Sequence, residues 1–239
     1  MKGLLSLTLL LLSGLLQAQD VQMSASAFQK ELLGVQKQFS ASNLEITYSR
    51  ELLIEGEETV KESGTFLRGS GLDYSLSQNG ALIVQNKTGK LIIDSVQRTV
   101  VLTIVDSLFS MMNTPDLTDE NVAKVYILSK SVSGKVSTYR MTPRSEGIER
   151  AELIVPVSGG TPVTMRVVLP LGNYISHSID DESLEEPVMT IVYTSVKNIK
   201  PSASAFSFEK HLSYSDGKYH LKGFPSDFIF HDLRPNTSK

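Results

Sequence analysis

Residues 72–104 read LDYSLSQNGALIVQNKTGKLIIDSVQRTVVLTI, and this stretch decides the fold. Asn79 and Gly80 separate two short runs of strand-forming residues, and an Asn-Gly pair accepts the positive φ angles of a two-residue hairpin turn. A second turn, Asn-Lys-Thr-Gly, leads into two further runs of the same kind. The pattern predicts four strands in an antiparallel meander, at residues 72–77, 81–85, 90–94 and 99–104.

The chain before this stretch adds one helix and two strands. Apolar residues recur at three- and four-residue steps over residues 24–39, which predicts an amphipathic helix with one apolar stripe. These residues are Phe28, Leu32, Val35 and Phe39. From residue 44 the apolar period changes to two, so half-buried strands are predicted over residues 44–52 and 59–67.

An apolar interruption follows the meander at residues 105–123. Its first part is predicted to form a helix that Pro115 stops, and Thr118 begins a capping pattern for a short second helix. Strand patterns then resume and end in a hairpin that turns through Asp216 and Gly217. These strands are predicted at residues 124–132, 135–141, 148–155, 163–169, 188–197 and 203–208, with hairpin strands at 211–214 and 219–222.

About a dozen strands with one helical interruption predict a mainly β fold built on one large, strongly curved antiparallel sheet. Such a sheet has an inner face that other elements must cover. No Pro- or Ser-rich linker separates two cores, so we expect a single domain over residues 19–239, with residues 210–239 as a C-terminal hairpin and tail.

The composition excludes several classes of binding site and covalent link. The chain has 239 residues, 23 Lys and Arg against 26 Asp and Glu, four His and no Cys. A net charge of -3 does not suit sequence-independent nucleic-acid binding, and a chain without Cys has no disulfide and no thiolate metal site. Gly69-Ser70-Gly71 is not a nucleophile elbow, because a strand rather than a helix follows it. We expect no enzymatic activity, cofactor or metal site.

The first eighteen residues predict a secretory signal peptide. Lys2 precedes residues 4–16, which contain nine leucines, and Ala18 supplies a small residue at the exit. This run is shorter than the roughly 20 apolar residues of a bilayer span, although an uncleaved N-terminal anchor is the alternative. Exported proteins without cysteine are commoner in bacterial envelopes than in eukaryotic secretions, so the composition favours an exported protein of a bacterial envelope.

Strand alternation selects candidate side chains for the inner face, although both faces are apolar in strands 163–169 and 188–197. The candidate lining residues are Ile46, Tyr48, Phe66, Tyr74, Met165, Val167, Ile191 and Tyr193. Phe109, Met111 and Met112 form a flexible apolar patch that suits either a lid over this face or an ordinary core. Arg50 stands among apolar neighbours, where it either extends to water or holds a lid carbonyl or a ligand head group.

Four stretches resemble the periplasmic outer-membrane lipoprotein carrier family (LolA-like). They are residues 39–48 after the N-terminal helix, ESGTFLR at 62–68, GKLIIDSVQ at 89–97, and MTIVY at 189–193 followed by AFSF at 205–208. The resemblance implies an incomplete antiparallel β-barrel with helices as a lid over an apolar cavity. It also implies that Arg68 matches the cavity Arg that tethers the lid, with Arg50 as the second candidate.

The resemblance further implies a function. A relative of this family carries lipoproteins or lipids across the periplasm toward the outer membrane, as a monomer that shields their acyl chains. Its partners are an inner-membrane lipoprotein-releasing transporter and an outer-membrane receptor. The sequence departs from the family pattern at Ser95, which stands where the family has Pro, and in its added residues 210–239. The alternative is an envelope interaction module of the same fold with a filled core and no lipid cargo.

Overall fold

The computed structural model describes residues 20–39, 41–105, 122–169 and 186–235. The chain divides into two compact units. The first unit comprises Met1–Gly34, Leu52–Thr59 and Asp116–Val192, and the second comprises Val35–Glu51, Val60–Pro115 and Tyr193–Lys239. The expectation of a single domain over residues 19–239 stays a prediction.

The strands are hydrogen-bonded in the order β1-β8-β9-β10-β11-β12-β2-β3-β4-β5-β6-β7-β15. Every strand pair with a described register is antiparallel except β7 with β15. The order has two ends, β1 and β15, so the sheet is not closed. The predicted mainly β fold with an open antiparallel sheet is therefore confirmed.

The first unit carries one long helix on a sheet. Its elements are β1 (Val21–Gln22), most of α2 (Ala25–Phe39), α3 (Val122–Val125), β8 (Tyr126–Ser133), β9 (Val136–Pro143), β10 (Arg150–Pro156), β11 (Val163–Val168) and the start of β12 (Val188–Lys197). The side-chain oxygen of Ser24 accepts a hydrogen bond from the backbone N–H of Ala27 at 3.2 Å and so caps the start of α2. Phe28 and Leu32 are buried, so the apolar stripe of the helix faces the core.

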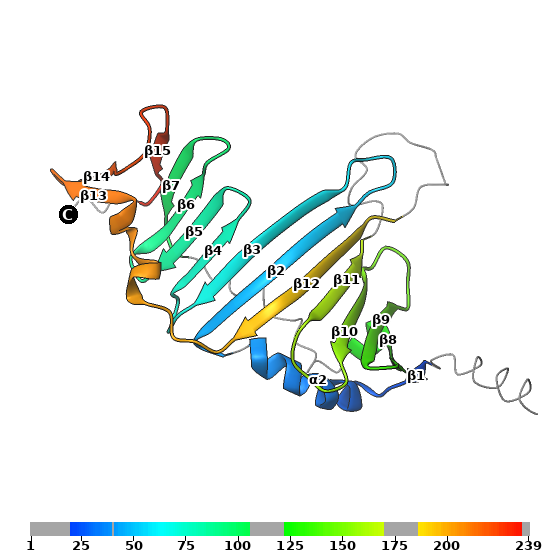
Figure 1. Ribbon diagram of the computed structural model, residues 1–239. Helices are drawn as coiled ribbons and strands as arrows, with labels where there is room; N and C mark the ends of the chain where they lie inside the picture. The colour runs from blue at the N-terminus through cyan, green and yellow to red at the C-terminus, as the bar shows by residue number, and fades with distance from the viewer. Residues whose placement is uncertain (1–19, 40, 106–121, 170–185, 236–239) are drawn as a thin grey trace, which may run out of the picture. The chain divides into compact units, whose positions relative to one another are not determined.

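The second unit contains the predicted meander (Figure 1). Its elements are β2 (Leu44–Leu53), β3 (Val60–Arg68), β4 (Tyr74–Gln78), β5 (Ala81–Asn86), β6 (Gly89–Asp94), β7 (Thr99–Thr103), η3 (Ala203–Phe206), η4 (Phe208–Lys210), β13 (Leu212–Ser215), β14 (Lys218–Leu221) and β15 (Ile229–Asp232). Asn79 and Gly80 have φ angles of 41° and 82°, as the hairpin turn requires. The β13–β14 hairpin forms as predicted, with Tyr214 opposite Tyr219.

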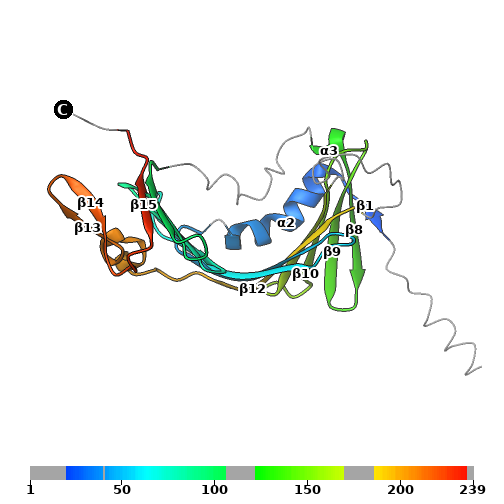
Figure 2. The same ribbon diagram turned by 90° about the horizontal axis from the view of Figure 1, so that it is seen from above.

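Strand β15 is an element that the sequence did not predict. It pairs in parallel with β7, with Phe230 opposite Val100 and Asp232 opposite Leu102. In the view of Figure 2, β15 lies between β7 and the β13–β14 hairpin. The C-terminal residues thus extend the sheet by one strand as well as forming a hairpin.

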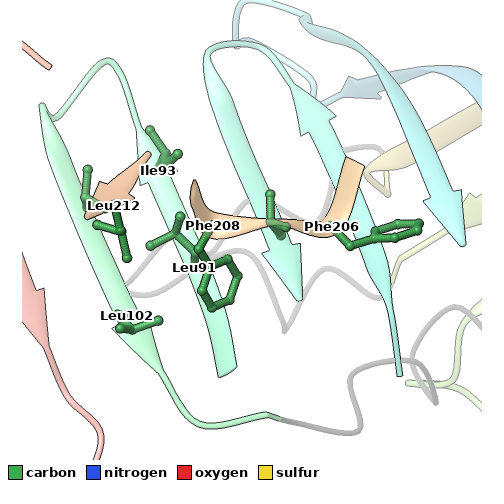
Figure 3. Packing of buried hydrophobic residues seen from close by; sticks show 8 residues of the cluster. Leu91, Ile93, Leu102, Phe206, Phe208 and Leu212 are labelled. Atoms are coloured by element: carbon green, nitrogen blue, oxygen red, sulfur yellow. The ribbon is translucent and has the colours of Figure 1, made fainter. Parts of the chain in front are cut away.

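The predicted strand at residues 203–208 is wrong, because the chain forms the two short 3-10 helices η3 and η4 there. Phe206 and Phe208 belong to one buried cluster with Leu91, Leu102 and other strand residues (Figure 3). The amide nitrogen of Asn86 donates to the backbone oxygen of Phe206 at 2.7 Å and holds the segment in place. Burial of both rings in one cluster therefore overrides the alternating pattern.

Other boundaries differ from the predictions by a few residues. The strand predicted from residue 124 begins at Tyr126, because Val122–Val125 forms the helix α3. The predicted helix before Pro115, and with it Phe109, Met111 and Met112, lies outside the described residues. Within the described ranges, no helix has the length and apolar character needed to cross a bilayer.

Candidate functional site

An apolar row crosses five strands of the second unit. In the strand register, Phe66 of β3 lies opposite Leu76 of β4, and Leu76 lies opposite Ile83 of β5. Ile83 lies opposite Ile92 of β6, which lies opposite Val101 of β7. Residues directly opposite in an antiparallel pair point to the same face. Four strand spacings of about 4.8 Å make this row about 19 Å long.

Polar side chains border the apolar row along much of its length. The same register places two further rows on this face. One row is Arg68, Tyr74, Gln85, Lys90 and Thr103, and the other is Gly64, Gln78, Ala81, Asp94 and Thr99. The face therefore has an apolar stripe with mostly polar residues on both sides, a pattern that suits a long apolar ligand with a polar end.

One end of the row is closed by packing. Leu44, Ile46, Phe66 and Tyr74 are buried in one cluster, and Phe39 at the end of α2 packs against it. The ring of Phe39 meets the ring of Tyr193 edge to face, with centroids 4.9 Å apart. Burial raises the pKa of Tyr193. Four of the predicted lining residues thus lie together here, and they are packed against protein side chains.

The rest of the row is less buried than Phe66 within the described part of the chain. Ile92 and Val101 are half-buried, and neither belongs to a described hydrophobic cluster. Leu76 and Ile83, in the middle of the row, are partly buried against the closed end. The four residues from β4 to β7 are therefore half-buried alike, whereas Phe66 at the closed end is buried.

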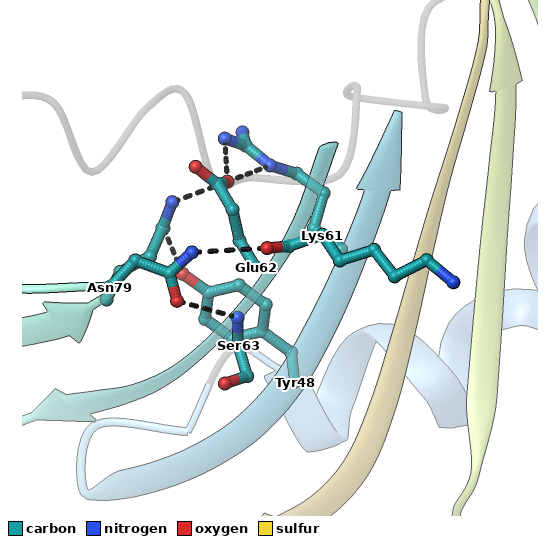
Figure 4. Close-up of polar contacts among 7 residues, drawn as sticks. Tyr48, Lys61, Glu62, Ser63 and Asn79 are labelled. Atoms are coloured by element: carbon teal, nitrogen blue, oxygen red, sulfur yellow. Dashed lines mark hydrogen bonds and ion pairs between the residues drawn. The ribbon is translucent and has the colours of Figure 1, made fainter. Parts of the chain in front are cut away.

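A chain of hydrogen bonds lies on this face beside the closed end (Figure 4). The hydroxyl of Tyr48 donates to Oε1 of Gln78 at 2.6 Å, and Nε2 of Gln78 donates to Oε2 of Glu62 at 2.7 Å. Arg50 Nε donates to the same Glu62 oxygen at 2.7 Å. Burial is the main cause that raises the pKa of Tyr48. Tyr48 therefore lies at the polar border of the apolar cluster.

The same contacts settle the surroundings of Arg50. Its guanidinium forms an ion pair with Glu62 on the neighbouring strand β3. The sequence left open whether Arg50 extends to water or binds a lid or a ligand. It did not identify Glu62 as the partner of Arg50. Glu62 is recognisable only from the β2–β3 pairing, because twelve residues separate it from Arg50 in the chain.

Arg68 reaches the end of helix α2. Its Nη1 donates to the backbone oxygen of Phe39 at 3.5 Å. The last carbonyl groups of a helix have no partner within the helix, so a cation there is favourable. Burial lowers the pKa of Arg68. Arg68 therefore contacts a backbone carbonyl at the end of α2, and its role in tethering a lid stays a prediction.

In the first unit, α2 lies on the face that carries Met165. The ring of Phe28 meets Tyr139 edge to face at 5.7 Å, and Leu153 lies opposite both Tyr139 and Met165. Glu31 accepts hydrogen bonds from Lys130 and from the hydroxyl of Tyr139, the latter at 2.9 Å. The hydrogen bond from Lys130 lowers the pKa of Glu31.

The remaining predicted lining residues also lie in the first unit. Val167 follows Met165 two positions along β11, on the same face, and is buried. Ile191 of β12 is half-buried. Whether any of the eight predicted residues lines a lipid cavity stays a prediction.

The main feature of this face of the second unit is its apolar row. In the described ranges, no group of three His, Cys, Asp or Glu residues is placed to hold a metal ion. His211 and His220, on the C-terminal hairpin, are therefore not part of such a group. What the face can do chemically is take apolar groups out of water, which contributes free energy without directed chemistry.

Sequence reasoning missed four members of the apolar row: Leu76, Ile83, Ile92 and Val101. The signal was present, because the turn at Asn79 and Gly80 sets the pairing of β4 with β5 and places Leu76 opposite Ile83.

Comparisons with known proteins show only distant likeness. No protein-family model and no curated protein matches the chain. Among solved structures, it is similar to a chain of the Pseudomonas aeruginosa MucA/MucB complex, with 13% identity over 77% of this chain and a TM-score of 0.43. This chain spans 61% of the length of that one.

Two further solved structures match over nearly their whole length. A DUF1329 family protein from Desulfovibrio piger has 10% identity and a TM-score of 0.38, and it covers 78% of this chain and 98% of its own. A LolA superfamily protein from Nitrosomonas europaea has 11% identity and a TM-score of 0.26, and it covers 77% of this chain and 98% of its own. A LolA superfamily protein is thus among the structures similar to this chain.

Proposed function

We propose that the protein is a non-enzymatic periplasmic carrier that shields the acyl chains of lipoproteins or lipids on their way toward the outer membrane. The observation that supports this function best is the apolar row from Phe66 to Val101 on one face of the second unit. Phe66 is buried, so the part of the row available to a ligand runs from Leu76 to Val101 over three strand spacings, about 14 Å. This is close to the depth of the hydrocarbon of one leaflet, about 15 Å, which is half of a core of about 30 Å.

The energetics limit the kind of cargo. About twelve methylene groups, each contributing about 0.8 kcal/mol when fully buried, give about 10 kcal/mol. An acyl chain that lies on an open face buries only about half of its own surface, so it gains about 5 kcal/mol. The cost of association is about 4–15 kcal/mol. A single uncovered acyl chain therefore binds weakly. The proposal accordingly requires a cargo with several chains or a cover over the row.

The proposal assigns the cover to residues 105–123, with Phe109, Met111 and Met112 in contact with the cargo. In this proposal Arg68 tethers the closed state by its hydrogen bonds to backbone carbonyls. The proposed partners are an inner-membrane lipoprotein-releasing transporter and an outer-membrane receptor.

A second function is favoured by the packing at the closed end of the row. Ile46, Phe66 and Tyr74 are at most 5% exposed and fill their cluster with protein side chains. If the rest of the face is filled in the same way, the protein is an envelope interaction module without lipid cargo.

Binding of a fluorescent fatty acid to the protein without residues 1–18 separates these two functions. A carrier binds the probe saturably and releases it when phospholipid or an acylated lipoprotein is added. Ile92→Glu places a carboxylate in the row and weakens probe binding by at least tenfold, since burying a charge there is unfavourable. Val96→Glu is the matched control, because Val96 is 79% exposed in the β6–β7 turn, and it leaves binding unchanged.

Two results would count against the carrier. Absence of saturable probe binding by the folded protein would favour the interaction module. Equal probe binding by the Ile92→Glu and Val96→Glu variants would show that the row does not hold the probe.

A further inference from the structure

The free edge of β15 presents backbone groups that a sheet partner needs. The backbone nitrogen of Ile229 donates to the oxygen of Arg98, and that of Leu233 donates to the oxygen of Leu102. Backbone groups alternate between the two edges of a strand, so the N–H and C=O groups of Phe230 and Asp232 point away from β7. In the described part of the chain, these groups have no backbone partner.

Two features that commonly protect an edge strand, lysine and proline, are absent from β15 itself. Edge strands are commonly blocked by lysine, by proline or by a bulge, and β15 has the sequence IFHD. Ile229 and Leu233 are 57% and 65% exposed beside it. β15 is short and ends in the charged Asp232, but its exposed apolar neighbours and outward backbone groups suit the addition of another strand.

A pocket lies against the same edge. It has a volume of about 1120 Å³, and Phe230, Asp232 and Arg234 form its β15 side. Tyr214 and Tyr219 of the β13–β14 hairpin form the other side, with their rings edge to face at 4.9 Å. The pocket is slightly larger than the usual range of small-ligand sites, about 300–1,000 Å³, and two tyrosines line it.

The pocket walls are held by polar contacts within the second unit. Arg234 donates to both carboxylate oxygens of Asp232, at 2.9 and 2.6 Å. The guanidinium of Arg234 lies over the ring of Tyr219, 4.7 Å from its centroid. Lys218 adds an exposed ammonium group to the lining.

We propose that an extended peptide of a partner protein adds as a strand to the free edge of β15 and places an apolar side chain in this pocket. Only a polypeptide offers N–H and C=O groups at the spacing of Phe230 and Asp232, whereas an acyl chain offers neither. The β13–β14 hairpin stands beside the edge, which favours a single strand over the broad sheet of a second copy (Figure 2). Lys218 favours an acidic residue next to the apolar one.

The probe for this site is a fluorescein-labelled peptide of alternating Val and Thr with one central Phe followed by Glu. Its binding is measured by fluorescence anisotropy. The control peptide has the same side chains but carries N-methyl groups on alternate residues, on the edge that would face β15. We expect saturable binding of the first peptide and at least tenfold weaker binding of the N-methylated one, because N-methylation removes the donors that pair with a strand.

A matched pair of protein variants tests the backbone pairing between the peptide and β15 by changing the protein instead of the peptide. Asp232→Ala and Asp232→Pro both remove the carboxylate, but only proline removes the outward N–H. We expect the proline variant to bind the peptide about tenfold more weakly than the alanine variant. Circular dichroism checks that both variants keep the fold. If the proline variant does not fold, the N-methylated peptide still tests the proposal on the unchanged protein.

Four results would overturn the proposal. Equal binding of the two peptides would exclude strand addition, as would equal affinity of the two folded variants. Displacement of the peptide by a fatty acid would show that the pocket takes an acyl chain instead. A dimer that is present in Asp232→Ala and lost in Asp232→Pro, without peptide binding, would identify a second copy as the occupant. Ile92→Glu separates this site from the proposed acyl row, because it leaves peptide binding unchanged.

Discussion

Gly64 lies where β3 has no room for a side chain. A Cβ atom added there would lie 2.7 Å from the hydroxyl oxygen of Tyr48 and 2.8 Å from the backbone oxygen of Ser77. Real Cβ atoms do not approach other atoms this closely, so Gly64→Ala forces the Tyr48 ring or the β3 backbone to move. Moving the ring breaks its hydrogen bond to Gln78.

The expected loss follows from these two contributions. Overpacking costs about 1–3 kcal/mol, and the lost hydrogen bond costs about 1 kcal/mol. We therefore expect Gly64→Ala to lower the free energy of unfolding by about 2–4 kcal/mol. Urea unfolding followed by far-ultraviolet circular dichroism measures this loss, since the chain has no tryptophan to report by fluorescence.

Gly34→Ala is the matched control for this experiment. Gly34 lies in helix α2 and has no atom within 4 Å of the position that a Cβ would take. The same chemical change should raise stability there by about 0.5–1 kcal/mol, because alanine favours the helix. The reasoning is refuted if the two variants shift the unfolding free energy equally, or if Gly64→Ala stays within about 0.5 kcal/mol of the unchanged protein.

Three further predictions follow from contacts in the two units. Arg68→Leu removes the hydrogen bond to Phe39, so we expect a retained fold with slower release of bound lipid, and unchanged release would exclude Arg68 from the proposed mechanism. The pKa of Glu31 is lowered in the folded state, so its contribution to stability is complete above its unfolded pKa of about 4.3 and is lost as the pH falls through the folded value. Thermal unfolding at several pH values should show this loss, and Glu31→Gln should remove that part of the pH dependence. Phe206→Ala empties a buried position and should lower stability by about 3–5 kcal/mol, whereas a loss below about 1 kcal/mol would show that the C-terminal segment does not complete this core.

Local patterns in the sequence predicted most of the strands. The turn at Asn79 and Gly80 joins strands that are adjacent in the chain, so its geometry also determines their register. The hairpin at Asp216 and Gly217 was predictable for the same reason. The helix α2 was predictable because its apolar residues recur with the helical period.

The candidate site was only partly predictable. Alternation within β2, β3 and β4 identified Ile46, Phe66 and Tyr74, which the structure brings together in one buried cluster. Alternation did not reveal that Phe39 and Tyr193 close this end, nor that the row continues through Ile92 to Val101. A periodic pattern shows which side chains share a face of one strand, but it does not show which other element covers that face.

The sequence alone determined the antiparallel meander, the helix α2 and the absence of cysteine chemistry, because each depends on neighbouring residues or on composition. Only the tertiary structure decided the contacts between distant segments. Asn86 holds Phe206 across 120 residues, and β15 pairs in parallel with β7. The alternating pattern at residues 203–208 looks the same as the pattern in segments that do form strands. Whether such a segment becomes a strand depends on which apolar surface is left for it to cover after the local hairpins have formed.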